Sequence, residues 1–266
     1  MIDFEYREKY GVYDLKKLIT LLRSNNGCPW DRVQTHESIR RNFLEEAYEA
    51  VEAIDEKDPE HLCEELGDVL TQVVFHSSIE EDAGNFDLDD VADMVCKKLI
   101  LRHPHVFSDG KAKDADEVLV KWDEIKRVEK NQETVTSSLE AVAKSLPALW
   151  RAEKIQKKAA KTGFAWPDVT GALAKLEEEM RELLKATETG SGAEEELGDL
   201  LFAAVNVARY LDADPEKVLG QACDKFIRRF GRAEESAELS GRSLEDLPLD
   251  VFLALYEEAK AEIPND

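Results

Sequence analysis

Two segments of this chain carry the same arrangement of acidic residues, at a spacing that could bind a metal ion. The first reads Glu-Glu-Ala-Tyr-Glu at 45–49 and Glu-Leu-Gly-Asp at 65–68, and the second reads Glu-Glu-Met-Arg-Glu at 178–182 and Glu-Leu-Gly-Asp at 196–199. Residues three or four apart share a helix face, so two packed helices would direct four carboxylates to one point. Two carboxylates about 4 Å apart repel each other by roughly 4 kcal/mol at an effective dielectric constant near 20. A fold that gathers four of them needs a cation, so the pattern predicts a metal site in each segment.

The ligand types indicate which metal this is. Carboxylates without softer ligands favour Mg²⁺ or Mn²⁺, which take oxygen ligands and usually hold substrate phosphates as well. A di-iron carboxylate bundle requires Glu-x-x-His, and none of the five histidines has a glutamate three residues before it. A zinc site requires closely spaced His or Cys ligands. His103 and His105 are close, but Pro104 between them prevents a shared helical face. The predicted cofactor is Mg²⁺, with Mn²⁺ as the alternative.

Each acidic segment is followed by a basic pair, spaced i, i+4, and by an aromatic residue. These residues are Lys98, Arg102 and Trp122 after the first segment, and Lys225, Arg229 and Tyr256 after the second. Mg²⁺ beside Lys and Arg suits phosphoryl chemistry, because the metal polarises the phosphorus centre and the basic groups neutralise phosphate oxygens. An aromatic ring could stack a nucleotide base. Two plainer interpretations stay open: a salt-bridged helix surface for the basic pairs, and core packing for the tryptophan.

Hydrophobic periodicity predicts helices almost throughout. Phe43, Ala47, Val51 and Ile54 form one apolar stripe. Asp58-Pro59 and Asp214-Pro215 are typical of a helix start, with an N-cap followed by proline. Alternating strand patterns are absent. We therefore expect an all-α fold of two tandem modules, an N-terminal domain at 1–135 and a linker helix with a C-terminal domain at 136–266.

Composition limits the partners and the compartment. With 35 basic and 58 acidic residues, the formal charge is 35 − 58 = −23, which argues against binding to nucleic acid or to anionic membranes. The four cysteines form no Cys-x-x-Cys pair and suit reduced thiols. The N-terminus lacks the features of a signal peptide, and no apolar run reaches membrane-spanning length. The expected location is the cytoplasm.

These motifs resemble the MazG family of nucleoside triphosphate pyrophosphohydrolases. The resemblance to two-domain bacterial members extends to Gly-Cys-Pro-Trp-Asp at 27–31, Arg-His-Pro-His-Val-Phe at 102–107 and Gly-Phe-Ala-Trp at 163–166. It implies Mg²⁺-dependent hydrolysis of nucleoside triphosphates between the α and β phosphates, giving a monophosphate and pyrophosphate. It also implies broad base specificity, a role in sanitising the nucleotide pool, and four-helix-bundle-like cores completed in a homodimer.

The resemblance also assigns roles to residues. The metal ligands would form a first quartet, Glu46, Glu49, Glu65 and Asp68, and a second quartet, Glu179, Glu182, Glu196 and Asp199. In the family the C-terminal copy is the one credited with activity. The nucleotide would therefore contact Lys175, Lys225, Arg229 and Tyr256, with Lys98, Arg102 and Trp122 as the first-copy counterparts. Glu178 and Glu45, one residue before the first ligand in each copy, are candidate general bases for the attacking water.

Two other interpretations compete with a hydrolase. In a chain with 58 acidic residues, a single Glu-Glu-x-x-Glu motif is often only a solvated helix face, but its duplication together with Glu-Leu-Gly-Asp disfavours that explanation. A regulatory module that binds metal or nucleotide without turnover is the alternative function. Release of pyrophosphate would separate it from an enzyme.

Overall fold

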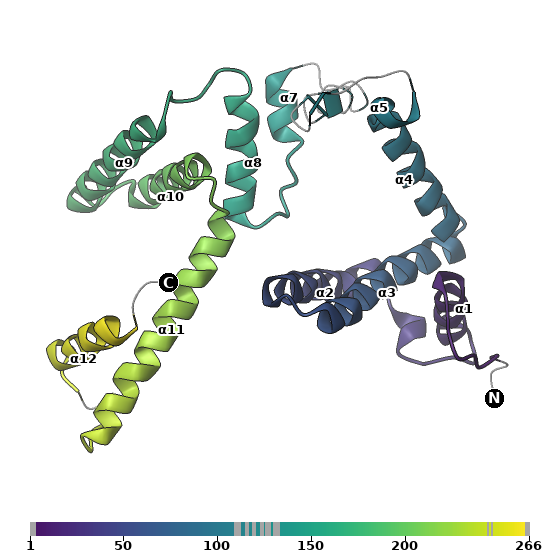
Figure 1. Ribbon diagram of the computed structural model, residues 1–266, viewed down its shortest axis with the longest axis horizontal. Helices are drawn as coiled ribbons and strands as arrows, with labels where there is room; N and C mark the ends of the chain where they lie inside the picture. The colour runs from purple at the N-terminus through teal and green to yellow at the C-terminus, as the bar shows by residue number, and fades with distance from the viewer. Residues whose placement is uncertain are drawn as a thin grey trace. The chain divides into compact units, whose positions relative to one another are not determined.

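The computed structural model is helical and describes residues 4–108, 113–114, 117–118, 121–122, 125, 129, 134–243, 245 and 247–263. Within these ranges no strand occurs, which confirms the expected all-α class. The chain divides into two compact units, Met1–Ile125 and Lys126–Asp266 (Figure 1), a division at 125 where the domain proposal placed it at 135. None of the described helices has both the length and the apolar character that crossing a membrane requires.

The first unit is organised around two long helices. Its elements are α1 (Val12–Arg23), η1 (Asp31–Val33), α2 (His36–Glu56), α3 (Pro59–Ala83), α4 (Leu88–Arg102) and α5 (Pro104–Phe107). α2 and α3 pack along each other, and α1 packs against α3. The connection is short because Lys57 ends α2 in the left-handed region, at φ 59°, and the Asp58 side chain accepts hydrogen bonds from the first backbone N–H groups of α3. A two-residue link of this kind holds the two helices together as a hairpin.

The second unit repeats this helix pair. Its elements are α7 (Val135–Glu140), α8 (Ala148–Ala160), α9 (Val169–Thr189), α10 (Ala193–Tyr210), α11 (Pro215–Leu239) and α12 (Leu249–Glu262). α9 packs along α10 as α2 does along α3, and α8 packs against α10. Gly190 and Gly192, both at positive φ, make the tight link between α9 and α10. The tandem arrangement of helical modules is thus confirmed.

The buried cores are small for the length of the helices. In the first unit the core contains Ile19, Ile39, Val74, Phe75 and Leu88. In the second unit the repeated helix pair leaves large apolar side chains exposed: Leu173, Met180 and Leu184 on α9, and Leu197, Leu201 and Phe202 on α10. On α2 the exposed apolar side chains are Leu44, Tyr48, Val51 and Ile54. Each helix pair therefore carries an apolar face that its own unit does not cover.

Gly27 closes the turn that follows α1. Its N–H donates to the carbonyl of Ser24 at 2.9 Å, and Cys28 N–H donates to the carbonyl of Leu22 at 2.7 Å. A Cβ on Gly27 would lie 2.2 Å from the Leu22 carbonyl oxygen and 2.3 Å from that of Leu21. Backbone atoms cannot yield as a flexible side chain would, so only glycine fits this turn.

We expect Gly27→Ala to lower the free energy of unfolding by more than about 1 kcal/mol, because the native turn cannot accept a side chain. Urea unfolding in EDTA checks this. Gly67→Ala is the matched control, because a Cβ on this mid-helix glycine meets no atom within 4 Å and a helix gains about 0.5–1 kcal/mol from alanine. Equal stability of the Gly27 variant and the wild type would contradict the expectation.

Candidate metal centre

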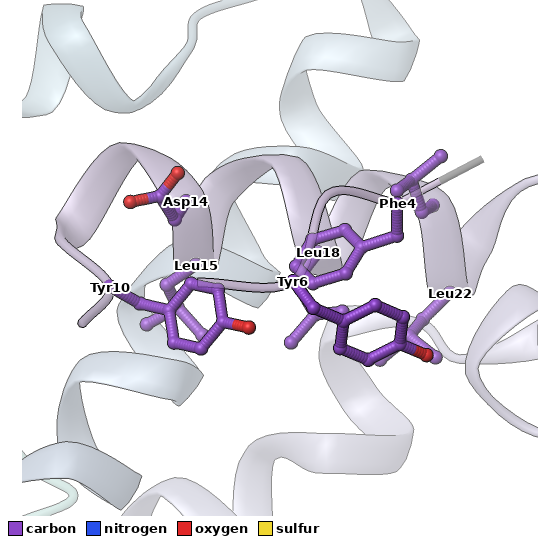
Figure 2. A pocket seen from close by; sticks show the side chains of 8 residues that line it. Phe4, Tyr6, Tyr10, Asp14, Leu15, Leu18 and Leu22 are labelled. Atoms are coloured by element: carbon purple, nitrogen blue, oxygen red, sulfur yellow. The ribbon is translucent and has the colours of Figure 1, made fainter. Parts of the chain in front are cut away.

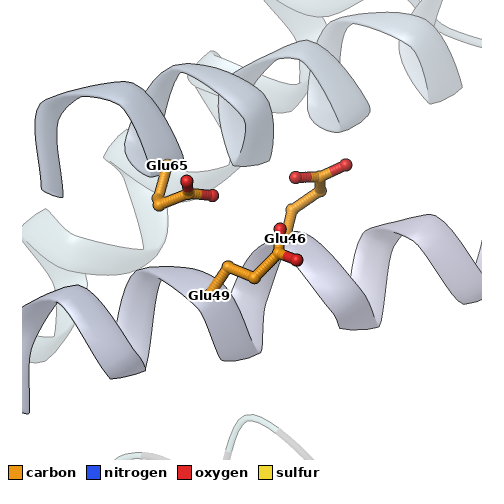
Figure 3. Close-up of side chains that lie close together, drawn as sticks. All are labelled: Glu46, Glu49 and Glu65. Atoms are coloured by element: carbon orange, nitrogen blue, oxygen red, sulfur yellow. The ribbon is translucent and has the colours of Figure 1, made fainter. Parts of the chain in front are cut away.

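The first quartet comes from α2 and α3. Glu46 and Glu49 lie one turn apart on α2, and Glu65 lies on the facing side of α3. One carboxylate oxygen from each of these three lies within 4.8 Å of the others, and Figure 3 shows the side chains reaching into the space between the two helices. Asp68 is exposed and outside this group of three, although its charge is close enough to raise the pKa of Glu46.

The second quartet has the same origin in α9 and α10. Here Glu179, Glu196 and Asp199 each contribute an oxygen within 4.8 Å of the others. Glu182 is exposed and lies outside the three, but it is hydrogen-bonded to Glu179. Each copy therefore brings three of its four expected ligands together, and the fourth remains within electrostatic range.

The carboxylates are held where their charge is poorly compensated. Burial, and then the charges of Asp68, Glu49 and Glu65, raise the pKa of Glu46. Partial desolvation and the hydrogen bond from Glu179 raise the pKa of Glu182. Oε2 of Glu65 is buried without a hydrogen-bond partner in the described structure. Buried polar atoms are nearly always paired, so this oxygen and the oxygen-only donor set fit a hard divalent cation such as Mg²⁺ or Mn²⁺.

These pKa shifts predict how stability depends on pH and metal. An acid whose pKa is raised in the folded state destabilises the fold as the pH rises above its unfolded value of 4.5. A bound cation removes that penalty. We therefore expect Mg²⁺ to raise the melting temperature more at pH 7.5 than at pH 5, measured against EDTA. Glu46→Gln should reduce this difference, and a shift that does not depend on pH would contradict it.

Lys175 distinguishes the two copies. Its Nζ lies 2.7 Å from Oε1 of Glu178 and 2.7 Å from Oε1 of Glu179, and these two partners raise the pKa of the lysine. The offset of 133 residues that aligns Glu178 with Glu45 places Asn42 in the corresponding position. The second copy thus has an internal cation beside its ligands where the first copy has a neutral amide. Sequence reasoning missed this difference, although the alignment of the two copies shows it.

The candidate bases lie beside the acidic clusters. Glu178 accepts a hydrogen bond from Lys175 at 2.7 Å, and Glu45 accepts one from Arg41 at 2.8 Å. Both glutamates are exposed, and neither belongs to the groups of three. Each is thus held by a cation next to the cluster, and its role as base stays a proposal.

The expected nucleotide-binding residues of the first unit are also partly used for packing. Arg102 is buried, and its guanidinium carbon lies 5.1 Å from the centroid of the Trp122 ring. This is within the range of a cation–π contact. Lys98 is exposed on α4. The structure therefore brings Arg102 and Trp122 together as predicted partners, with the arginine stacked on the ring.

The counterparts in the second unit lie on α11 and α12. Arg229 is buried, and its Nε and Nη2 donate to the carbonyl of Ile263 at 3.1 and 2.9 Å. Tyr256 packs against Phe226, with ring centroids 5.6 Å apart. α12 packs on α11, and α11 packs on α8. Figure 1 shows α12 beside the far half of α11, away from α9 and α10. Lys225, Arg229 and Tyr256 are therefore not brought to the second quartet within one protomer.

The structure also places a histidine next to the first quartet. Nδ1 of His61 lies 3.0 Å from Oε2 of Glu56, and its Nε2 lies 3.3 Å from Oε1 of Glu65. The offset of 131 residues that aligns Glu65 with Glu196 places Gly192 opposite this histidine. Sequence reasoning did not select His61, since it tested histidines only against iron and zinc spacings.

A separate apolar groove of about 690 Å³ lies along α1 and the segment before it (Figure 2). It is lined by Phe4, Tyr6, Tyr10, Asp14, Leu15, Leu18, Leu21 and Leu22. Its charged lining group is the carboxylate of Asp14, which would repel a phosphate. The groove is therefore unsuited to a triphosphate.

Comparison with known proteins agrees with these features. A family model described as the MazG nucleotide pyrophosphohydrolase domain matches residues 34–107 and 169–231, the segments that contain the two quartets. The nucleoside triphosphate pyrophosphohydrolase/pyrophosphatase MazG of Thermotoga maritima is 44% identical over 93% of this chain and 94% of its own length. The nucleoside triphosphate pyrophosphohydrolase of Escherichia coli K12 is 39% identical over 92% and 97%. The uncharacterized protein YabN of Bacillus subtilis is 48% identical over 92% of this chain and 50% of its own length.

Proposed function

This chain belongs to the MazG family of nucleotide pyrophosphohydrolases, as its motifs predicted, and we propose that it is an Mg²⁺-dependent hydrolase of nucleoside triphosphates with broad base specificity. The bond cleaved lies between the α and β phosphates, and the products are a nucleoside monophosphate and pyrophosphate. Removal of non-standard nucleotides from the pool is the proposed role. The four free cysteines suit the reducing cytoplasm as its location.

The observation that carries the proposal is the second quartet with Lys175 beside it. Three of its carboxylates lie within 4.8 Å of one another, and the lysine lies 2.7 Å from Glu179. Acidic side chains alone would repel a triphosphate. A cluster that holds a divalent cation and adjoins a fixed ammonium group instead attracts one.

The roles of the second copy follow from this arrangement. Glu179, Glu182, Glu196 and Asp199 would hold the Mg²⁺. Bound there, the ion would neutralise phosphate oxygens and make the phosphorus centre more electrophilic. Lys175 would contribute positive charge to the phosphate chain, and Glu178 beside it would accept the proton of the attacking water. Lys225 and Arg229 would bind phosphate oxygens, and Tyr256 would stack on the base.

We further propose that the protein is a homodimer in which the partner copy completes the site. Lys225 and Tyr256 lie on helices that pack away from α9 and α10 in one protomer (Figure 1). Exposed apolar side chains cover the repeated helix pair, among them Met180, Leu184 and Leu201. Contiguous apolar surface of this kind marks an interface between proteins. Docking of a second copy on this face would bury it and bring a second set of basic residues near the quartet.

The first copy favours the alternative function, a module that binds metal or nucleotide without turnover. It gathers the same carboxylates, but Asn42 stands where the second copy has Lys175. Without that ammonium group, the first copy lacks one positive charge for the developing charge on the phosphates. We therefore assign turnover to the second copy.

Product analysis with a mixed panel of nucleoside triphosphates and Mg²⁺ tests the proposal. Pyrophosphate and monophosphate are expected from several bases. Orthophosphate and diphosphate would mean that a different bond is cleaved. If neither pyrophosphate nor orthophosphate appears with Mg²⁺ or Mn²⁺, the whole chain is a binding module. A dialysed sample without added metal is the control.

A further inference from the structure

The first copy contains a nitrogen ligand that the second copy lacks. His61 lies in the first turn of α3, four residues before Glu65 on the same helix face. Its Nε2 is 3.3 Å from Oε1 of Glu65, longer than the roughly 2.7–2.9 Å of a charge-assisted hydrogen bond. Two ligand atoms about 2.1 Å from one ion and about 90–109° apart are separated by roughly 3.0–3.4 Å. The nitrogen and the oxygen are therefore spaced as neighbouring ligands of one cation.

The other nitrogen of the imidazole is held in the way that metal-binding histidines require. Nδ1 of His61 is 3.0 Å from Oε2 of Glu56, so an Nδ1–H donates to this carboxylate and leaves the lone pair on Nε2. Metal-bound histidines almost always donate their second N–H to a carboxylate, a carbonyl or water, which fixes the ring orientation. Glu56 ends α2 and Asp58 caps α3, so the short helix link sets this geometry.

Glu65 supplies an independent sign of a missing partner. Its residue is 9% exposed, and Oε2 is buried with no hydrogen-bond partner in the described structure. The carboxylate reaches toward Glu46 and Glu49 between the two helices (Figure 3). One oxygen of Glu65 thus faces the imidazole, and the group as a whole also joins the acidic cluster.

We propose that the first copy is a mixed nitrogen–oxygen metal site, in which His61 Nε2 and Glu65 bind one cation and select a first-row transition ion such as Mn²⁺ over Mg²⁺. The second copy has Gly192 at the corresponding position and offers oxygen ligands, which suit Mg²⁺. Imidazole nitrogen favours transition metals, whereas Mg²⁺ prefers oxygen and water. This inference rests on the proposed function in one respect, that each acidic cluster binds a divalent cation.

The test uses the full chain with Glu179→Ala and Glu196→Ala, so that bound Mn²⁺ reports the first copy. Pulsed electron paramagnetic resonance of bound Mn²⁺ should show coupling to one imidazole nitrogen. His61→Gln should remove that coupling and weaken Mn²⁺ at least about tenfold, with a smaller effect on Mg²⁺. Glu56→Gln should keep the coupling and weaken Mn²⁺ by about 10-fold or more, as second-shell changes do.

His36→Gln is the matched control, because this histidine lies at the other end of α2 and bonds to His76 and Glu80; it should leave Mn²⁺ binding unchanged. Mn²⁺ bound without nitrogen coupling, and unaffected by His61→Gln, would overturn the inference and leave the hydrolase proposal intact. Absence of Mn²⁺ from the first copy would overturn it as well. Failure of the hydrolase proposal would show separately, as missing pyrophosphate release by the unmodified protein.

Discussion

Replacing Glu179 by alanine is expected to reduce pyrophosphate release more than about 100-fold, since even second-shell changes at metal sites cost 10–100-fold. Glu179 is buried, gathers with Glu196 and Asp199, and is bound by Lys175. Its loss removes a ligand and the anchor of the adjacent cation together. Steady-state rates with Mg²⁺ and a nucleoside triphosphate measure the effect.

Glu46→Ala is the matched control in the first copy, with expected rates within about twofold of the wild type if the two sites act independently. Lys175→Asn adds a second comparison, because it gives the second copy the residue that stands at Asn42 in the first. It should slow turnover while leaving Mg²⁺ binding. Loss of activity in the Glu46 variant with retention in the Glu179 variant would reverse the assignment of turnover to the second copy. Melting curves in EDTA verify that each variant folds.

The second large effect is expected from mixing two inactive variants. Glu179→Ala disables the quartet, and Lys225→Ala removes a proposed phosphate-binding charge, a loss worth about 100-fold. If a site combines the quartet of one protomer with α11 of its partner, a mixed dimer has one intact site. Random assembly would then restore about a quarter of wild-type activity, because half of the dimers are mixed and each has one of two sites.

The mixture is prepared by co-expression with two affinity tags, and the doubly tagged dimers are assayed separately. Lys225 is chosen over Arg229 because the latter is buried and bonded to the carbonyl of Ile263, so its loss would disturb packing. A double variant in one chain, mixed with wild type, is the control for subunit exchange. No recovery in purified mixed dimers would place the complete site within one protomer.

The helical elements and their pairing were predictable from local chemistry. Asp58-Pro59 and Asp214-Pro215 predicted helix starts, and α3 and α11 begin at Pro59 and Pro215. The duplicated motif predicted two equivalent helix pairs, and α2–α3 and α9–α10 form them. Capping and apolar periodicity depend on residues a few positions apart, so they are legible without a tertiary structure.

Features that depend on side-chain neighbours were less accessible. The expectation that Gly67 and Gly198 allow close helix approach was wrong within the described protomer, because a Cβ on either would meet no atom within 4 Å. Arg102 and Arg229, expected at a nucleotide, are buried against Trp122 and Ile263. Spacing gives the face of a helix, and not what packs on that face.

The sequence by itself determined that this is an all-α chain of two modules, each with a repeated set of carboxylates, because helix periodicity and ligand chemistry are properties of short segments. Only the tertiary structure decided which three acids of each quartet converge, that Lys175 bridges Glu178 and Glu179, and that His61 lies between Glu56 and Glu65. Those distances follow from the crossing of two helices and the rotamers their contacts permit, which depend on residues distant in the chain.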